Sequence, residues 1–437
     1  MSSRILLLAL CLPSTLLAAN WPSWRGIAGD GITAETDLPL TWSATENVKW
    51  KVSLPEPGNS TPIVWGDRIF LTQAVGADRL LIALSRKDGA ELWRGGAKGV
   101  EREPTHETNP YCSSSPVTDG GRVIAWFGSG GLWCFDLEGK ELWHRDLGPH
   151  RHMWGYAAAP VIHGDLCYLN FGPGDRTFLL AVDKSTGKDV WRVEVPAITP
   201  TLPRTDGFGA KADGVIGSWS TPIVVKTGER EELVITYPEQ VQAYDLKTGK
   251  QLWHCRGLNP LIYTSPVAGE GVVVGTGGYG GSSLAVRAGG SGDVTDSHRL
   301  WHKPRDQQRI GTGVIKDGHL YILNTPGVAQ CIELKTGAVV WQERLAGSAT
   351  RTCLSLICSQ ASLSITLIRF PNPVWRHLHI RYFTGKELIQ HVFSPHQNGL
   401  SSRKMALPRM PNGIYPMDYS ERHAPVGKTA AHRNGFR

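Results

Sequence analysis

The chain has 437 residues, of which 41% are hydrophobic, and it contains 50 glycines and 16 tryptophans, so it can bury a large core. Its net charge of +7 is uneven, because residues 350–437 hold 12 Lys/Arg and 3 Asp/Glu whereas the rest of the chain holds 34 and 36. The main part is therefore close to neutral and lacks a clustered basic stripe, which argues against a nucleic-acid partner.

Residues 1–19 have the pattern of a secretory signal peptide. Arg4 precedes an apolar run from Ile5 to Leu12, and the small residues Ala18 and Ala19 come before the polar Asn20. No later run in the sequence is long and apolar enough to span a bilayer. We therefore expect an exported protein, periplasmic or extracellular, without a transmembrane segment.

Residues 20–46 form a leader that carries no repeat. It begins with the tryptophan-rich stretch Trp21-Pro22-Ser23-Trp24-Arg25-Gly26. We expect it to pass around the outside or the base of the domain that follows.

One pattern recurs through residues 47–347, and its clearest copy is Ala243–Trp253. An apolar run ends at Asp245, whose carboxylate can accept hydrogen bonds from the backbone two and three residues later, and Gly249 supplies the positive φ of a tight reversal. Trp253 follows on a short strand. Its side chain would bury about 150–250 Å² and needs a neighbouring copy of the repeat to do so. The structural tryptophans of the series are Trp50, Trp93, Trp143, Trp191, Trp253, Trp301 and Trp341, and the turn aspartates are Asp136, Asp183 and Asp245.

The spacing of this pattern predicts a propeller. Successive tryptophans lie 40 to 62 residues apart, and a Ser/Thr-rich pair with proline, such as Ser220-Thr221-Pro222, precedes most of them. The interval from proline to tryptophan leaves room for four short strands and three turns. In the first repeat these strands would be 61–65, 68–73, 79–85 and 91–94. We predict an all-β fold, a β-propeller of four-stranded antiparallel blades with six legible blades.

The pattern Ala-x-Asp-x-x-Thr-Gly-x-x-x-Trp resembles that of the quinoprotein-type, or PQQ-repeat, β-propellers, and the resemblance covers about residues 21–345. That group includes alcohol dehydrogenases that use pyrroloquinoline quinone, BamB-like outer-membrane assembly lipoproteins, and secreted bacterial propellers of unknown role. The resemblance implies the fold, whereas the activity has to be argued from the site.

The loops that join the fourth strand of one blade to the first strand of the next are long and aromatic. They share one face of a propeller, here called the upper face, with the turns between strands two and three, which are glycine-rich in this sequence. Small turns beside aromatic loops predict a shallow funnel of the kind that binds a small molecule or a peptide. The candidate ligand-binding residues are His106, Asn109, Tyr111, His152, Trp154, Tyr156, Trp219, Asn259, Tyr263 and Arg309.

Each group of candidates has a structural alternative. Trp154, Trp219 and Tyr263 either stack against a flat ring or a sugar, or they are core residues at the top of the blades. Arg309 either faces an anionic ligand or is a solvated charge at the rim. The histidines His106 and His152 have no fixed metal-ligand spacing, so we assign no metal.

The resemblance implies, for the dehydrogenases, a quinone on the propeller axis, a calcium ion held by carboxylate and amide side chains, and usually two adjacent cysteines. This chain has no adjacent cysteines, and no first-strand Asp or Glu matches the calcium site. We therefore assign no cofactor and no catalytic residue, and expect a non-catalytic binding or scaffolding propeller for a small ligand or a protein partner. The alternative is a quinoprotein dehydrogenase that oxidises an alcohol or a sugar with pyrroloquinoline quinone and calcium.

Residues 348–437 interrupt the pattern. Residues 350–437 contain 5 glycines in 88 residues, where the preceding 349 residues contain 45. Eighty-eight residues are the length of two blades, and an eight-bladed ring closed by the Trp50 strand needs two blades after Trp341. We expect an eight-bladed plan whose C-terminal blades are lost or scrambled by a slip of the reading frame near residue 348. A naturally divergent extension is the alternative.

Overall fold

The computed structural model describes residues 20–35, 47–195, 217–228, 230–278, 281–307, 311–324 and 327–344, together with the backbone of four strands between residues 352 and 389. The chain divides into one compact unit, Met1–Val392, and a second unit, Phe393–Arg437. The second unit, the expected signal peptide and Arg309 lie outside the described residues. Among the described residues, no helix is long and apolar enough to cross a membrane.

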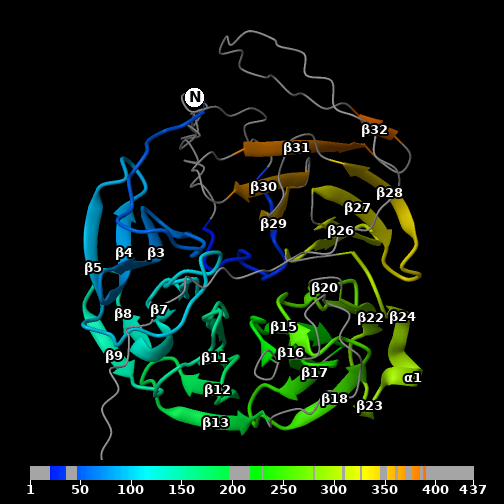
Figure 1. The fold of residues 1–437 in the computed structure, drawn as a ribbon, viewed down its shortest axis with the longest axis horizontal. Coiled ribbons are helices and arrows are strands. Elements are labelled where there is room, and N and C mark those ends of the chain that lie inside the picture. Colours follow the sequence, from blue (N-terminus) through cyan, green and yellow to red (C-terminus); the bar gives the residue numbers. More distant parts are fainter. Residues whose placement is uncertain are drawn as a thin grey trace, which may run out of the picture. The chain divides into compact units, whose positions relative to one another are not determined.

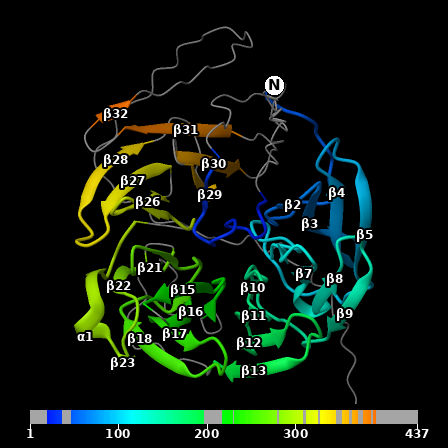
Figure 2. The same cartoon turned by 180° about the vertical axis from the view of Figure 1, so that it is seen from behind.

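Seven sheets follow one another along Met1–Val392, each with four antiparallel strands, and two of them carry a fifth strand that pairs in parallel (Figures 1 and 2). The first two contain β2 (Ile63–Trp65), β3 (Arg68–Val75), β4 (Asp78–Ser85) and β5 (Glu91–Ala97), then β6 (Val117–Thr118), β7 (Val123–Trp126), β8 (Leu132–Phe135) and β9 (Glu141–Arg145). The third and fourth contain β10 (Val161–His163), β11 (Leu166–Phe171), β12 (Phe178–Asp183) and β13 (Asp189–Glu194), then β15 (Ile223–Thr227), β16 (Arg230–Tyr237), β17 (Gln240–Asp245) and β18 (Gln251–Arg256).

The remaining sheets complete the series. The fifth and sixth contain β20 (Val267–Gly269), β21 (Val272–Thr276), β22 (Ser283–Arg287) and β24 (Arg299–Lys303), then β25 (Val314–Lys316), β26 (His319–Asn324), β27 (Val328–Glu333) and β28 (Val339–Arg344). The seventh contains β29 (Thr352–Ser359), β30 (Leu363–Arg369), β31 (Arg376–Phe383) and β32 (Glu387–Ile389). The minor elements are β1 (Ile32–Thr33), β14 (Gly217–Ser218), β19 (Leu261–Ile262), β23 (Gly292–Asp293), the 3₁₀ turn η1 (Gly128–Gly130) and α1 (Thr295–His298).

The prediction of an all-β propeller of four-stranded antiparallel blades is confirmed, and the six legible repeats correspond to the first six sheets. The seventh sheet comes from the segment that the sequence analysis set aside as carrying no repeat. Its strands, such as β29 and β30, are apolar and β-branched, but they carry neither the aspartate turn nor the tryptophan that the repeat search relied on. The described residues hold no eighth four-stranded sheet, and the frame slip stays a prediction.

The turn of the repeat is held by its aspartate. The Asp245 carboxylate accepts hydrogen bonds from the backbone N–H groups of Lys247 (3.1 Å) and Thr248 (2.8 Å), and Gly249 has a φ of 70°. Asp183 makes the same bonds in the third sheet. A hydrogen bond from the Thr248 hydroxyl to the carboxylate is the main reason that the pKa of Asp245 lies below its usual value.

The repeat tryptophans connect each sheet to the next. The indole N–H of Trp191 donates to the Leu246 carbonyl, which follows the turn aspartate of the next blade, at 2.9 Å. A Cβ added to Gly249 would lie 2.7 Å from the Trp191 ring, so glycine is needed for the contact as well as for its φ. The same indole bond joins Trp93 to Leu137, Trp143 to Lys184, Trp301 to Leu334 and Trp50 to Arg86, at 2.9, 3.1, 2.9 and 3.0 Å.

Trp253 departs from this arrangement. Its indole N–H donates to the buried Glu232 carboxylate at 2.8 Å, within its own sheet. The next blade carries a longer turn here, in which β23 pairs in parallel with β18 at Trp253 and His254. This added strand covers the edge on which Trp253 lies.

The Ser/Thr-Pro motif marks a second set of links, near the centre of the ring. The Thr221 N–H donates to the Ser265 hydroxyl at 2.9 Å, and the Ala159 N–H donates to the Thr221 hydroxyl at 2.9 Å. The Thr61 N–H likewise donates to Ser115 at 2.8 Å. Each bond joins the segment just before the first strand of one blade to the same segment of the next blade.

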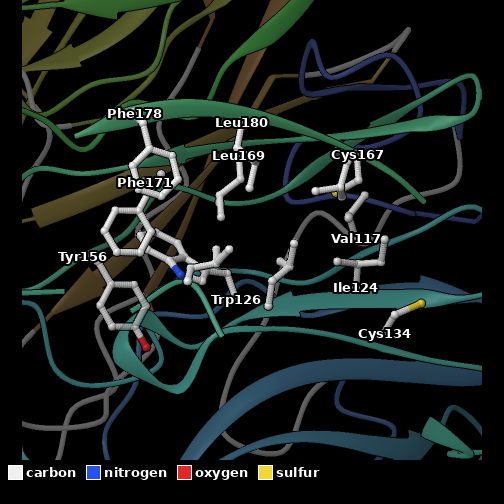
Figure 3. Close-up of a cluster of buried hydrophobic side chains, with 14 residues drawn as sticks. Val117, Ile124, Trp126, Cys134, Tyr156, Cys167, Leu169, Phe171, Phe178 and Leu180 are labelled. Atoms are coloured by element: carbon white, nitrogen blue, oxygen red, sulfur yellow. The ribbon is translucent and has the colours of Figure 1, made fainter. Parts of the chain in front are cut away.

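The aromatic side chains between the second and third sheets form one of the cores (Figure 3). Phe171 and Phe178 stack at 4.5 Å, and Trp126 from the second sheet lies 5.5 Å from Phe171. Cys134 and Cys167 lie in the same core, where burial raises the pKa of Cys134 to about 12. These two cysteines are therefore unreactive core residues.

The described part of the leader lies against inner strands, contrary to our expectation that it passes around the outside or the base. Trp21 exchanges two backbone hydrogen bonds with Val64 of β2, and the Pro22 carbonyl accepts from Thr118 of β6. The Arg25 guanidinium donates to the Gly313 carbonyl just before β25 at 2.8 Å, and β1 pairs in parallel with β29. Backbone groups at the ring centre thus satisfy a buried cation and hold this segment, the dark blue trace in Figure 1.

Candidate functional site

Four of the predicted site residues, His152, Trp154, Trp219 and Tyr263, meet on the upper face in what we call the aromatic cluster. The parallel pair β14–β19 aligns two of them, since Gly217 and Ser218 lie opposite Leu261 and Ile262. Trp219 and Tyr263 follow directly, and their rings stack at 5.3 Å with an interplanar angle of 11°.

The loop between β9 and β10 supplies the other two rings. Trp154 stacks on Trp219 at 6.0 Å, and the His152 ring meets Trp219 edge-on at 4.8 Å. The Trp219 indole N–H donates to the Gly155 carbonyl at 2.9 Å, which fixes the loop to the ring beneath it. Trp219 is buried, Trp154 and Tyr263 are half-buried, and Met153, which precedes Trp154 in the chain, is 56% exposed.

Two predicted residues hold the loops of the aromatic cluster in place. The Asn109 side-chain amide donates to the Trp154 carbonyl at 2.6 Å and to the Tyr156 carbonyl at 3.2 Å. The Asn259 side-chain amide donates to the Leu261 carbonyl at 2.6 Å, just before Tyr263. Both amides therefore position the backbone that carries the rings.

The other described candidates lie elsewhere. Tyr156 packs in the core against Trp126 at 4.8 Å. The Tyr111 hydroxyl donates to the Glu103 carbonyl at 2.8 Å, and the Arg79 guanidinium lies over the Tyr111 ring at 3.8 Å. His106 bonds to Thr108 within its own loop at 2.9 Å.

The buried carboxylate of Glu103 was not among the predicted site residues. Glu103 accepts hydrogen bonds from the Ser129 N–H at 3.1 Å and from the Ser129 hydroxyl, and that hydroxyl accepts from the His150 N–H at 2.9 Å. Burial raises the pKa of Glu103 above its usual range and lowers the pKa of His150 to about 4. No sequence signal separates Glu103 from Glu101, which is exposed.

The aromatic cluster does not fit pyrroloquinoline quinone stacked between its rings. Within the described ranges, no group of three or more His, Cys, Asp or Glu side chains could hold a metal ion. The rings of Trp154, Trp219 and Tyr263 lie 5.3 to 6.3 Å from one another. A flat ring between two of them needs about 7 Å, since each stacking contact takes about 3.5 Å. We therefore derive no step through this cofactor.

Two dehydrogenases are among the known proteins with sequences similar to this chain. A polyvinylalcohol dehydrogenase from Pseudomonas sp. is 25% identical over 265 residues, which are 54% of this chain and 40% of that protein. The quinohemoprotein alcohol dehydrogenase ADH-IIG from Pseudomonas putida is 28% identical over 176 residues, 38% of this chain and 23% of that protein. The chain thus spans less than half the length of these relatives.

Among solved structures, BamB from Moraxella catarrhalis aligns with a TM-score of 0.47 and 16% identity, and covers 75% of this chain and 81% of that one. The family profile described as outer membrane protein assembly factor BamB matches residues 33–171, 108–202 and 139–356. These matches cover most of the chain and include all six legible repeats. The chain belongs to this BamB-like family of PQQ-repeat β-propellers.

Proposed function

We propose that the protein is an exported, non-catalytic binding or scaffolding propeller that takes a ligand or a protein partner on the aromatic cluster. The observation that carries the proposal is that half-buried Trp154, next to exposed Met153 on a supported loop, lies 6.3 Å from the half-buried ring of Tyr263. Export rests on the signal-like pattern of residues 1–19.

The chemistry of the cluster favours an uncharged or apolar ligand. Aromatic rings offer a large, rigid contact area at a small entropic cost, and methionine adapts to partners of different shape. The hydrogen bonds from the Asn109 and Asn259 side chains to backbone carbonyls fix the loops before binding. The loops therefore lose little conformational entropy when the complex forms. Such a surface suits a neutral oligosaccharide or an apolar peptide segment.

Binding to neutral oligosaccharides and to apolar peptides, measured by calorimetry, tests the proposal. Trp154→Ala should weaken binding at least about tenfold if the ring is a central contact. Trp133→Ala is the matched control, because Trp133 of β8 stacks on His144 of β9 and is not part of the aromatic cluster. Equal affinities of the two variants would contradict the proposal.

A quinoprotein dehydrogenase is the second candidate, and the similarity to the polyvinylalcohol dehydrogenase favours it. The purified protein would be incubated with pyrroloquinoline quinone and calcium, freed of unbound cofactor, and examined by absorbance and by dye reduction with an alcohol. Retained absorbance together with dye reduction would replace the first proposal by the second. Loss of all absorbance on gel filtration would remove the second.

A further inference from the structure

The β9–β10 loop, which carries Trp154, is held near its start by the turn between β7 and β8. The His150 N–H donates to the Ser129 hydroxyl at 2.9 Å, and Ser129 belongs to η1. The His150 ring packs edge-on against Trp126 at 5.7 Å and against Phe171 at 5.5 Å. Trp154 follows four residues later in the chain. The hydrogen bonds of the His150 backbone therefore fix the point from which the chain leads to the aromatic cluster.

The Ser129 hydroxyl lies between two acceptors. It is within hydrogen-bonding distance of the Glu103 oxygen Oε2, and it lies 3.3 Å from the His150 carbonyl. A hydroxyl carries a single hydrogen, so it donates to only one of these acceptors at a time. The two bonds are therefore alternatives, and the ionisation of Glu103 selects between them.

Glu103 is buried, and only one of its two carboxyl oxygens is hydrogen-bonded. Burial raises the pKa of Glu103 above its usual range. Among the described residues Oε1 has no hydrogen-bond partner, whereas Oε2 faces Ser129. A proton on Glu103 is therefore better placed on Oε2, where it can be donated to the Ser129 oxygen. The Ser129 hydrogen is then available to the His150 carbonyl. An ionised Glu103 can only accept, so it takes the Ser129 hydrogen and the His150 carbonyl loses its donor.

We propose that Glu103 is a positioning residue, which acts through the Ser129 hydroxyl on the loop that carries Trp154. With Glu103 protonated, Ser129 bonds both the N–H and the carbonyl of His150. With Glu103 ionised, only the bond from the His150 N–H remains. The loop should therefore be held more firmly in the protonated state. The consequence for ligand binding rests on the proposed function of the aromatic cluster, whereas the hold on the loop does not.

The ionisation of Glu103 can be followed between pH 5 and pH 8. The titratable or charged groups around Glu103 and His150 are Arg79, Cys112, Tyr156 and His152. Burial raises the pKa of Cys112 to about 12 and the pKa of Tyr156 well above its usual value, and it lowers the pKa of His150 to about 4. The Arg79 guanidinium keeps its positive charge. Of these groups, only Glu103 and His152 can change charge in this range.

Hydrogen exchange of the full chain, corrected for the intrinsic exchange rate at each pH, measures the hold on the loop. A carboxyl group with a raised pKa stabilises the closed state below that pKa and loses this effect as the pH rises through it. The protection of the amides of residues 148–156 should therefore fall at least about threefold from pH 5 to pH 8, relative to the amides of β17. Constant relative protection would overturn the proposal.

Two variants separate the action of Glu103 through Ser129 from other causes. Glu103→Gln cannot ionise, so the protection of residues 148–156 should no longer depend on pH. Ser129→Ala leaves Glu103 titratable but removes the hydroxyl, and it should abolish the pH dependence as well. Glu101→Gln, at an exposed position two residues away, should keep it.

Either of two results would overturn the proposal. A pH dependence that survives in Glu103→Gln would assign the effect to another group, such as His152. A dependence that survives in Ser129→Ala would mean that Glu103 acts on the stability of the whole fold. The amides of β17 report whether each variant is folded. Because no ligand is used, a failure of the aromatic cluster to bind any ligand would refute the proposed function and leave this result unaffected.

Discussion

Gly249 is subject to two constraints, a φ of 70° and the Trp191 ring against its Cα. Gly271 has a similar φ of 75°, but nothing lies within 4 Å of the Cβ that alanine would add. Gly271→Ala should therefore lower the free energy of unfolding by about 1–2 kcal/mol, the cost of the left-handed conformation.

Gly249→Ala should cost about 1–3 kcal/mol more than Gly271→Ala, because the added methyl group also displaces the indole. Urea denaturation of the two variants measures the difference. Equal destabilisation by the two substitutions would contradict the contact between the Trp191 ring and Gly249.

His150 should make the fold sensitive to acid. Burial lowers the pKa of His150 from 6.5 to about 4. Between these two pH values the imidazole is therefore protonated in the unfolded chain and neutral in the folded protein. Stability should therefore fall as the pH drops from 6.5 to about 4, by on the order of 3 kcal/mol in total.

Glu103 acts in the opposite direction, since its raised pKa makes the folded state lose stability as the pH rises through that pKa. The contribution of His150 is therefore measured by comparing two proteins, the wild type and His150→Phe. For each of them the melting temperature is determined between pH 7 and pH 4, and the slopes of melting temperature against pH are compared. The variant should lose the His150 part of the slope. An unchanged slope would refute the burial of a neutral imidazole.

At the scale of elements, the hydroxyls of the Ser/Thr-Pro motif accept backbone hydrogen bonds that join neighbouring blades just before their first strands. Thr221→Val keeps the shape of the side chain but leaves the Ala159 N–H without the acceptor it has at 2.9 Å. This should lower the free energy of unfolding by about 1–3 kcal/mol, the cost of a buried group left without its bond. Thr227→Val at the half-buried end of β15 is the control, since the Thr227 hydroxyl donates only to the Arg230 carbonyl of its own sheet. An equal loss of stability in the two variants would contradict a contribution from the bond between blades.

The turn of each repeat could be predicted from the sequence because it depends on residues close together in the chain. Asp245 and Gly249 fix a turn within five residues, so the repeat could be read without knowledge of the neighbouring sheets. The parallel pairing of β23 with β18 could not, because Gly292 and Asp293 have no strand propensity and owe their conformation to the adjacent edge. The same holds for Glu232, whose partner Trp253 lies two strands away in the sheet.

The candidate site was predictable only in part. Aromatic loops on one face follow from the order of the repeats, but it is the pairing of β14 with β19 that stacks Trp219 on Tyr263. Asn109 and Asn259 look like ligand-binding residues in the sequence, whereas in the structure their amides bond to loop carbonyls. A side chain that holds a loop and one that holds a ligand have the same sequence signal.

At the scale of the whole molecule, Arg25 connects the leader to the ring. Its guanidinium is buried and donates to the carbonyls of Gly29, Asp30 and Gly313. Arg25→Met should leave these acceptors unpaired and lower the free energy of unfolding by about 2–4 kcal/mol. Denaturation and limited proteolysis measure the effect, with Lys87→Met at an exposed position as control. An Arg25→Met protein as stable as the control would refute the inner path of the leader.

The propeller depends on indole rings, such as those of Trp93, Trp143 and Trp191, that join one blade to the turn of the next. A crystal structure of the protein is the most direct measurement of this. It should show the indole nitrogens of Trp93, Trp143 and Trp191 within hydrogen-bonding distance of the carbonyls that follow the aspartates of the next blades. Rings that point into solvent, or that lie on helices, would contradict the propeller and the aromatic cluster built on it.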